Sequence, residues 1–472
     1  MNRGISWTAT LLAMAALALC AGQGVAVGAM PPPIDPLILP EDGPAAPPQS
    51  TQQRTLCVAP VSGGDGADIP PAQLDLAFDA VWPITTGTGQ RVAVIDTGVN
   101  RHPRLPNLEP GGDYVGTADG TEDCDAHGTV VAGLIGAQPV TGSGFSGAAP
   151  GATIITIRQS SSAYSLAGSQ DDPNIAENSS GYGNVDTMAM AVRHAADMGA
   201  TVINISEVAC KPAAEGINDQ RLGAAIQYAA VVKDIVVVAA AGNVGSGGCK
   251  TQNPPPNPLT PGADLWNSVN TLASPAWYDD FVLTVGSVDP TGVASSFSLG
   301  GPWVDVAAPG TGIVSLHPTE TGLTNGTYGP DGAVQAINGT SFAAPYVAAT
   351  AALVRSRYPD ITAAQVVQRI ESTAHAPAEG WNPYVGHGIV DPLAAVTALP
   401  SDAETYPLGH HTATLAALPV PPPPDNRARD AALLGVAAVG SLGVLALLSS
   451  FPIRRVFAER GHRSRHQETA ES

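Results

Sequence analysis

The stretch Arg91–Gly98, with the sequence Arg-Val-Ala-Val-Ile-Asp-Thr-Gly, determines the fold that we expect for this chain. Its first six residues form a run of strand length that is apolar between two charged ends and shows no polar alternation. Four similar runs follow along the chain, at Thr153–Arg158, Ala200–Ile205, Asp234–Ala240 and Phe281–Gly286. Two segments between them repeat apolar residues at helical spacing, Val185–Gly199 and Arg221–Val232. Apolar strands that alternate with helices predict an α/β fold, with a doubly wound, mostly parallel sheet and helices on both faces.

Polar residues with reactive side chains follow several of these elements. Asp96 ends the first strand, where sheets of this kind place functional groups. His127 precedes the apolar helix Val130–Ala137, and Asn243 follows the strand that ends near Ala240. Ser341 begins an alanine-rich helical run, at a position where a serine is often only a helix cap. Each of these residues taken alone has an ordinary structural explanation as a cap or a turn residue.

Together, the four residues form a set that acyl transfer requires. A serine hydroxyl is a weak nucleophile until an imidazole takes its proton, and a carboxylate must hold that imidazole in the right tautomer. Fixed donors must then stabilise the negative charge on the tetrahedral intermediate. We therefore predict that Asp96, His127 and Ser341 are catalytic, with the oxyanion bound by Asn243 and the N–H of Ser341. No cofactor is expected, and no Cys/His cluster has the spacing of a metal site.

The motifs around these residues resemble those of the subtilisin-like serine proteases. Asp96-Thr97-Gly98, His127-Gly128-Thr129 and Gly339–Pro345 (Gly-Thr-Ser-Phe-Ala-Ala-Pro) are similar to the three signatures of that family and occur in its order. The resemblance covers about residues 81–398. One departure concerns the substrate cleft, because Ser206-Glu207-Val208 stands where the family usually has a Ser-x-Gly strand. These bulkier or charged residues predict a narrowed cleft and restricted specificity.

The two ends of the chain predict export and a membrane anchor. The first 29 residues have the charge, apolar run and small residues of a signal peptide. Ala431–Ile453 is uncharged and long enough to cross a bilayer, and more arginines follow it than precede it. We therefore expect a single-pass type I protein of the cell membrane, with the large N-terminal part outside and a short cytoplasmic tail. The predicted organisation is a signal peptide (1–29), a Pro-rich extension (30–80), a peptidase domain (81–398), a Pro-rich linker (399–426), a transmembrane helix (427–453) and the tail (454–472).

Charge and cysteine content narrow the classes of partner and compartment. The net charge of −20 argues against nucleic acid as a partner, because such binding needs clustered Lys and Arg. Four cysteines remain outside the signal peptide, and an even number in an exported chain predicts two disulfides with three possible pairings. These cysteines are Cys57, Cys124, Cys210 and Cys249.

The flanking features resemble a narrower group, the mycosins. The signal peptide, the Pro-rich extension, the sequence Asp-Cys-Asp-Ala-His-Gly-Thr around His127 and the C-terminal anchor are similar to these membrane-anchored proteases of mycobacterial type VII secretion systems. This resemblance implies the pairings Cys57–Cys124 and Cys210–Cys249. It also implies protein substrates that pass through the same system, and membrane components of the secretion complex as partners.

Two other functions stay open at this point. The chain could be mainly a structural subunit that stabilises a secretion complex, or a free degradative protease, which would require loss of Ala431–Ile453. An inhibitory role for the 30–80 extension is disfavoured, because a disulfide through Cys57 would tether it permanently.

Overall fold

The computed structural model describes residues 29–64, 66–168, 181–246, 248–260, 263–329, 332–398 and 439–446. The chain divides into two units, residues 1–399 and 400–472. Outside the described residues lie the predicted signal peptide up to residue 28, the whole linker, the cytoplasmic tail and most of the predicted transmembrane helix. Residues 439–446 are helical. Within the described ranges, no helix combines the length and the apolar character needed to cross a membrane.

A seven-stranded parallel sheet forms the centre of the first unit, with the strand order β12-β11-β9-β7-β3-β5-β4. The strands are β3 (Arg91–Asp96), β4 (Leu108–Asp113), β5 (Thr153–Arg158), β7 (Val202–Ile205), β9 (Val236–Ala240), β11 (Val282–Val288) and β12 (Val306–Pro309). All five predicted strands are present, two of them with the predicted bounds. The two that sequence analysis missed, β4 and β12, are the edges of the sheet. An edge strand tolerates Pro and Gly, and β4 contains Pro110-Gly111-Gly112, which hides its strand pattern.

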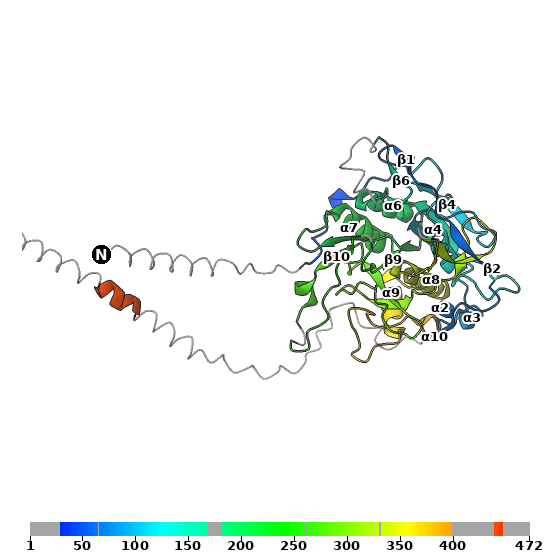
Figure 1. Ribbon diagram of the computed structural model, residues 1–472. Coiled ribbons are helices and arrows are strands. Elements are labelled where there is room, and N and C mark those ends of the chain that lie inside the picture. Colours follow the sequence, from blue (N-terminus) through cyan, green and yellow to red (C-terminus); the bar gives the residue numbers. More distant parts are fainter. Residues whose placement is uncertain are drawn as a thin grey trace, which may run out of the picture. The chain divides into compact units, whose positions relative to one another are not determined.

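Helices cover both faces of this sheet (Figure 1). On one face, Val92 and Val94 of β3 pack in a core shared with α4 (His127–Gly136) and α8 (Thr340–Arg357). On the other, Ala93 and Ile95 pack in a core shared with α6 (Val185–Asp197) and α7 (Gln220–Gln227), which a π-helical turn, η3 (Tyr228–Val232), extends. Because both faces are buried, the strands show no polar alternation. The remaining helices are η1 (Pro36–Ile38), α2 (Pro71–Leu74), α3 (Phe78–Val81), η4 (Leu265–Ser268), α9 (Ala363–Thr373) and α10 (Pro392–Thr397).

Helix α8 passes through the interior, and every residue from Thr340 to Val354 is buried. It contacts strands β7, β9 and β11 as well as helix α4. Its many alanines allow this close packing, since small side chains let a helix approach its neighbours. The residue at its start, Ser341, is therefore carried by one of the most enclosed elements of the fold.

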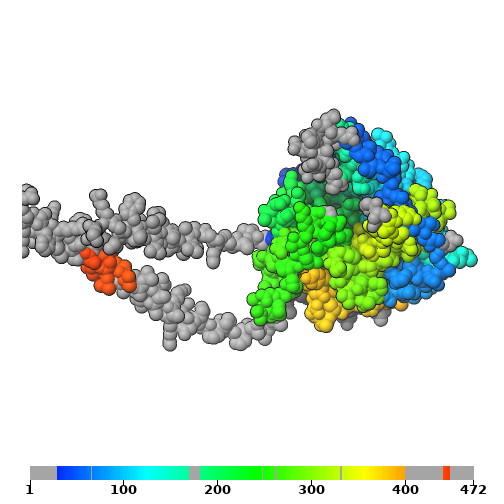
Figure 2. Space-filling view, in the orientation of Figure 1, coloured from blue at the N-terminus to red at the C-terminus, as the bar shows by residue number. Residues whose placement is uncertain are grey.

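The N-terminal extension is attached to the domain by strand pairing. Its β1 (Thr51–Gln53) pairs with β6 (Tyr164–Leu166), and β2 (Pro60–Gly64) pairs with β14 (Leu323–Tyr328). A disulfide joins Cys57, between these two strands, to Cys124. Short helices, η1, α2 and the start of α3, interrupt the segment, and the blue N-terminal residues lie along the surface of the domain (Figure 2). Its strand pairing was not predicted, because the partners lie far away in the sequence. The remaining strands are β8 (Ala209–Pro212), which pairs with β10 (Thr271–Ser274), and β13 (Ser315–Leu316) and β15 (Val334–Ala336), which flank β14.

Candidate functional site

Asp96, His127 and Ser341 form one continuous chain of hydrogen bonds. Asp96 Oδ1 lies 2.7 Å from His127 Nδ1, and His127 Nε2 lies 3.0 Å from Ser341 Oγ. The three side chains come from the end of β3, the start of α4 and the start of α8. Asp96 is fully buried, whereas 23% of the His127 side chain is exposed, which leaves one side of the imidazole open to the cleft.

A buried carboxylate that was not singled out in the sequence, Asp123, ties the Asp96 and His127 segments together. One of its oxygens accepts from the Thr97 hydroxyl at 2.9 Å, and the other accepts from the Thr129 N–H and hydroxyl at 2.8 and 2.6 Å. The Thr97 hydroxyl in turn accepts from the Gly128 N–H at 2.9 Å. Burial raises the pKa of Asp123 to about 6 despite these donors. Asp123 therefore links Thr97, which follows Asp96, to Thr129, which lies two residues after His127.

The amide of Asn243 is oriented by the residue before Ser341. Asn243 Oδ1 accepts hydrogen bonds from the N–H and the hydroxyl of Thr340, at 2.9 and 3.0 Å. This arrangement directs Asn243 Nδ2 toward Gly339: a Cβ placed on Gly339 would lie 3.4 Å from that nitrogen and 2.9 Å from Ser341 Oγ. The amide nitrogen and the serine hydroxyl thus face the same small space. Only a residue without a side chain at Gly339 leaves this space open.

Ser206 and Glu207 line the cavity that contains the Ser341 hydroxyl and the Asn243 amide. The cavity has a volume of about 280 Å³ and is lined by His127, Ser206, Glu207, Val208, Ala240, Gly242, Asn243, Ser246, Cys249, Asn338, Thr340, Ser341 and Phe342. The Ser206 hydroxyl donates to the backbone oxygen of Ser341 at 2.8 Å and accepts from Asn204 Nδ2 at 2.9 Å. The Phe342 ring packs against the His127 ring, with centroids 4.8 Å apart. The predicted site residues other than Cys57 and Cys124 therefore either line this cavity or, like Asp96 and Cys210, contact a residue that does.

Electrostatics couple Glu207 to His127. Burial together with the carboxylates of Asp96 and Asp125 raises the pKa of Glu207 to about 7, opposed by His127 and by a hydrogen bond from Ser160. For His127, burial lowers the pKa, but the Asp96 carboxylate outweighs it, and with smaller contributions from Glu207 and Asp123 the pKa rises to about 9. The neighbouring carboxylates therefore favour the protonated form of the imidazole.

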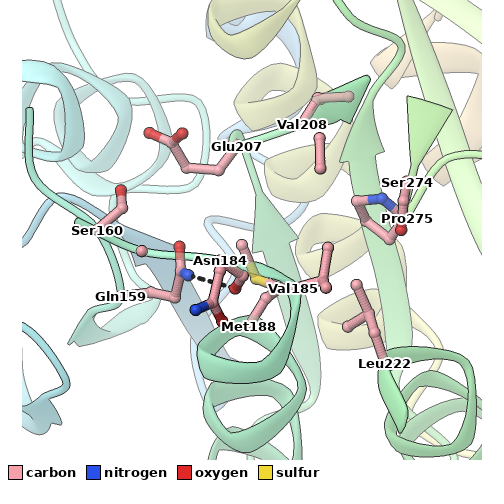
Figure 3. A pocket seen from close by; sticks show the side chains of 12 residues that line it. Gln159, Ser160, Asn184, Val185, Met188, Glu207, Val208, Leu222, Ser274 and Pro275 are labelled. Atoms are coloured by element: carbon pink, nitrogen blue, oxygen red, sulfur yellow. Dashed lines mark hydrogen bonds between the residues drawn. The ribbon is translucent and has the colours of Figure 1, made fainter. Parts of the chain in front are cut away.

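A second hollow adjoins this cavity beyond Glu207 (Figure 3). It has a volume of about 100 Å³, and Val185, Met188, Leu222 and Val208 give it an apolar wall. The carboxylate of Glu207 points away from Leu222 and toward the side on which Ser160 lies (Figure 3). Glu207 thus lies between a polar cavity that contains the Ser341 hydroxyl and a hollow with an apolar wall, and neither is lined by Lys or Arg.

One group among the described residues has the composition of a metal site, namely Asp96, His127 and Glu207, which offer ligand atoms within 4.8 Å of one another. A cation there would compete with the hydrogen bonds that Asp96 and His127 already make to each other and to Ser341. The donor set therefore fits proton transfer along the Asp96–His127–Ser341 chain better than a resident metal.

Comparison with known proteins agrees with this geometry. Residues 87–388 match the model of the subtilase family. Mycosin-4 of Mycobacterium tuberculosis is 51% identical over 460 residues, which cover 94% of this chain and 96% of that protein. The solved structure of the MycP3 protease from the type VII (ESX-3) secretion system is 47% identical, with a TM-score of 0.73, and the match covers 78% of this chain and 100% of that one. A chain in an intact ESX-5 inner membrane complex is 43% identical, with a TM-score of 0.74, and the match covers 89% of this chain and 99% of that one.

Proposed function

The chain belongs to the mycosins of the subtilase family and is a serine endopeptidase with a subtilisin-like α/β fold, and on this basis we propose that Asp96, His127 and Ser341 are its catalytic triad. The observation that carries this proposal is the unbroken hydrogen-bond chain from a buried carboxylate through an imidazole to a hydroxyl at a helix start. Ser341 Oγ attacks the carbonyl carbon of the scissile bond, and His127 Nε2 takes the hydroxyl proton. Asp96 keeps the tautomer in which Nε2 is the acceptor and stabilises the imidazolium that forms.

The negative charge of the tetrahedral intermediate is stabilised by two donors. Asn243 Nδ2 supplies one, since its oxygen is held by Thr340, and the N–H of Ser341 at the start of α8 supplies the other. Collapse of the intermediate expels the amine, which takes the proton from His127, and leaves an acyl group on Ser341. A water activated by His127 then releases the acid in the second half of the reaction.

Restricted specificity follows from the cleft wall. Glu207 and Val208 line the cavity that contains Ser341, and Glu207 adds a carboxylate close to His127. A peptide must therefore fit its side chains around these two residues to reach the hydroxyl. The extension does not compete with the substrate for this space, since none of its described residues lines the cavity. This supports the view that the extension is a permanent part of the domain and not an inhibitory segment.

We further propose that the enzyme is anchored outside the cytoplasm through Ala431–Ile453 and works with a type VII secretion complex. Similarity to a chain of the ESX-5 inner membrane complex supports this placement, and the two disulfides suit an oxidising compartment. The substrates are then proteins exported by the same system. The alternative, a mainly structural subunit, is supported by the same similarity, because a chain within a membrane complex can stabilise it without cleaving anything.

The substitution Ser341→Ala in the full chain tests the proposed enzyme function. Purified protein should lose peptidase activity by a factor of at least about 10³ while keeping its melting temperature, since Ser341 makes no bond that the fold depends on except through its backbone. In cells, profiling of protein N-termini in the culture medium should show cleavage products that the variant strain lacks. If secretion persists with Ser341→Ala but fails when the gene is deleted, the structural role is primary. An unchanged set of N-termini would refute the proposal of specific processing.

A further inference from the structure

The disulfide Cys210–Cys249 lies directly beside the backbone that carries Asn243. A Cβ placed on Gly242 would lie 3.3 Å from Cys249 Sγ and 3.6 Å from Cys210 Sγ. Gly242 has a positive φ of 107°, so this backbone turns sharply between the end of β9 and Asn243. Both cysteines are buried, and Cys249 lines the cavity that contains Ser341.

Hydrogen bonds connect Cys249 to the segment that follows Asn243. Gly245 N–H donates to the Cys249 oxygen at 2.8 Å, Cys249 N–H donates to the Ser246 oxygen at 2.9 Å, and Ser246 N–H donates to the Asn243 oxygen at 3.1 Å. The disulfide therefore contacts the residue before Asn243 through its sulfur atoms and the residues after it through Cys249. Displacement of this bridge would release the turn on both sides of Asn243.

The other cysteine of the bridge, Cys210, belongs to the wall of the cleft that Ser206-Glu207-Val208 begins. Cys210 lies in β8, which directly follows Ser206-Glu207-Val208, and pairs with Ala273 of β10. Ser206 is itself bonded to the backbone oxygen of Ser341. The bridge thus joins the wall next to Ser341 to the turn that carries Asn243, and it sets the separation of the two.

We propose that Cys210–Cys249 is a positioning element for the oxyanion donor Asn243, acting through Gly242, beyond any contribution to global stability. This inference rests on the proposed role of Asn243 in the reaction. Transition-state donors lose most of their effect when they are displaced by a fraction of an ångström, because the bond to the developing oxyanion is short and directional. A second anchor, the bond from Val244 N–H to the Phe297 oxygen at 2.7 Å, limits how far the turn can move. Loss of the bridge should therefore weaken Asn243 without abolishing its effect.

The test is a double-mutant cycle on the full chain. Four proteins are compared: wild type, Cys210→Ser/Cys249→Ser, Asn243→Ala, and the triple variant. Asn243→Ala should lower kcat about 10²- to 10³-fold. Loss of the bridge alone should lower kcat about tenfold with little change in KM, and loss of the bridge in the Asn243→Ala background should lower kcat by less than about twofold. This non-additivity is the result that a purely structural disulfide would not produce.

The Cys57–Cys124 bridge provides the matched control. Its removal is the same chemical change at a site next to Asp123, far along the chain from Asn243, so any effect on kcat should be equal in both backgrounds. Circular dichroism and thermal unfolding show which variants are folded. If the serine variant does not fold, the Cys57→Ser/Cys124→Ser protein, whose only remaining bridge is Cys210–Cys249, is reduced and reoxidised while kcat is followed.

The outcomes separate the inference from the proposed function on which it rests. Equal costs of bridge loss with and without Asn243, or no change in kcat on bridge loss or reduction, would overturn the positioning role and leave the triad mechanism standing. Wild-type activity in Asn243→Ala would overturn the role of Asn243 and the inference with it. Activity in Ser341→Ala would overturn the triad itself.

Discussion

Replacing Glu207 by Gln should make the enzyme more active at neutral pH. The Glu207 carboxylate and the His127 imidazole present atoms within 4.8 Å of each other, and the pKa of His127 is raised to about 9. Because the imidazole must be neutral to accept the Ser341 proton, a raised pKa lowers the fraction of the enzyme that can react near neutral pH. Gln has nearly the same size as Glu and removes only the charge, so the substitution isolates the electrostatic effect.

The size of the effect follows from Coulomb's law. Two full charges about 4.8 Å apart interact by about 3.5 kcal/mol at an effective dielectric constant of about 20, or about 2.5 pKa units. Glu207 lines a solvent-open cleft, where water screens the pair, so only part of this interaction applies. We expect the His127 pKa to fall by about one unit, which raises the neutral fraction at pH 7, and with it kcat/KM, about tenfold. Near pH 10, where the imidazole is neutral in both proteins, the gain should vanish.

The assay is the pH dependence of kcat/KM with one peptide substrate. The midpoint of the rising limb is compared, because a change in peptide affinity scales the whole curve without moving the midpoint. The control is Glu371→Gln, which also removes a carboxylate whose pKa burial raises to about 7, but on α9, outside the cavity. An unmoved or upward-shifted limb in Glu207→Gln would refute the electrostatic coupling, and an equal shift in both variants would show that it is not local.

Three further predictions follow from the geometry. Gly339→Ala should lower kcat about 100-fold, because the new methyl group would lie 2.9 Å from Ser341 Oγ. The melting temperature should not change, because the φ of 161° at this position is extended backbone that alanine adopts. Steady-state kinetics measure the first effect and thermal unfolding the second. The pKa of Glu371 is raised in the folded chain, so folding is favoured when Glu371 is protonated, and this stability is lost as the pH rises from about 4.5 through about 7. Glu371→Gln should therefore be more stable than wild type by about 1–2 kcal/mol at pH 8, with a smaller difference at pH 5. Denaturant unfolding at the two pH values measures both differences. Asp123→Ala should cost about 2–4 kcal/mol in unfolding free energy, since it leaves buried donors of Thr129 without an acceptor, and an unchanged urea midpoint would contradict this.

Much of the fold could be predicted from local patterns in the sequence. β3 and β5 have the predicted bounds, because a strand buried on both faces must be apolar throughout its length, and α6 begins at its predicted residue. The edge strand β4 was not predicted, because it contains Pro and Gly, which a strand tolerates at the edge of a sheet but which hide the usual strand pattern. The pairing of β1 with β6 and of β2 with β14 could not be predicted, since the register of an antiparallel pair depends on which distant segment lies opposite.

In the candidate site, too, some residues can be predicted from local sequence and others cannot. Asp96, His127, Ser341 and Asn243 could be proposed as site residues from the sequence, because short motifs mark each of them at the end of an element. Asp123 could have been suspected from its place four residues before His127, yet carboxylates in loops are common and nothing local marks this one as buried.

By itself, the sequence determined the residue types that the proposed reaction needs, most of the strands and helices that carry them, and the number of cysteines available for disulfides. Tertiary structure alone decided that Asp96 and Ser341, 245 positions apart in number, meet on the same imidazole, and that Glu207 shares its field. It also decided that Cys249 lies against the turn before Asn243. Chemical identity and periodicity are local properties of a chain, whereas distance, burial and charge coupling exist only once distant segments pack against one another.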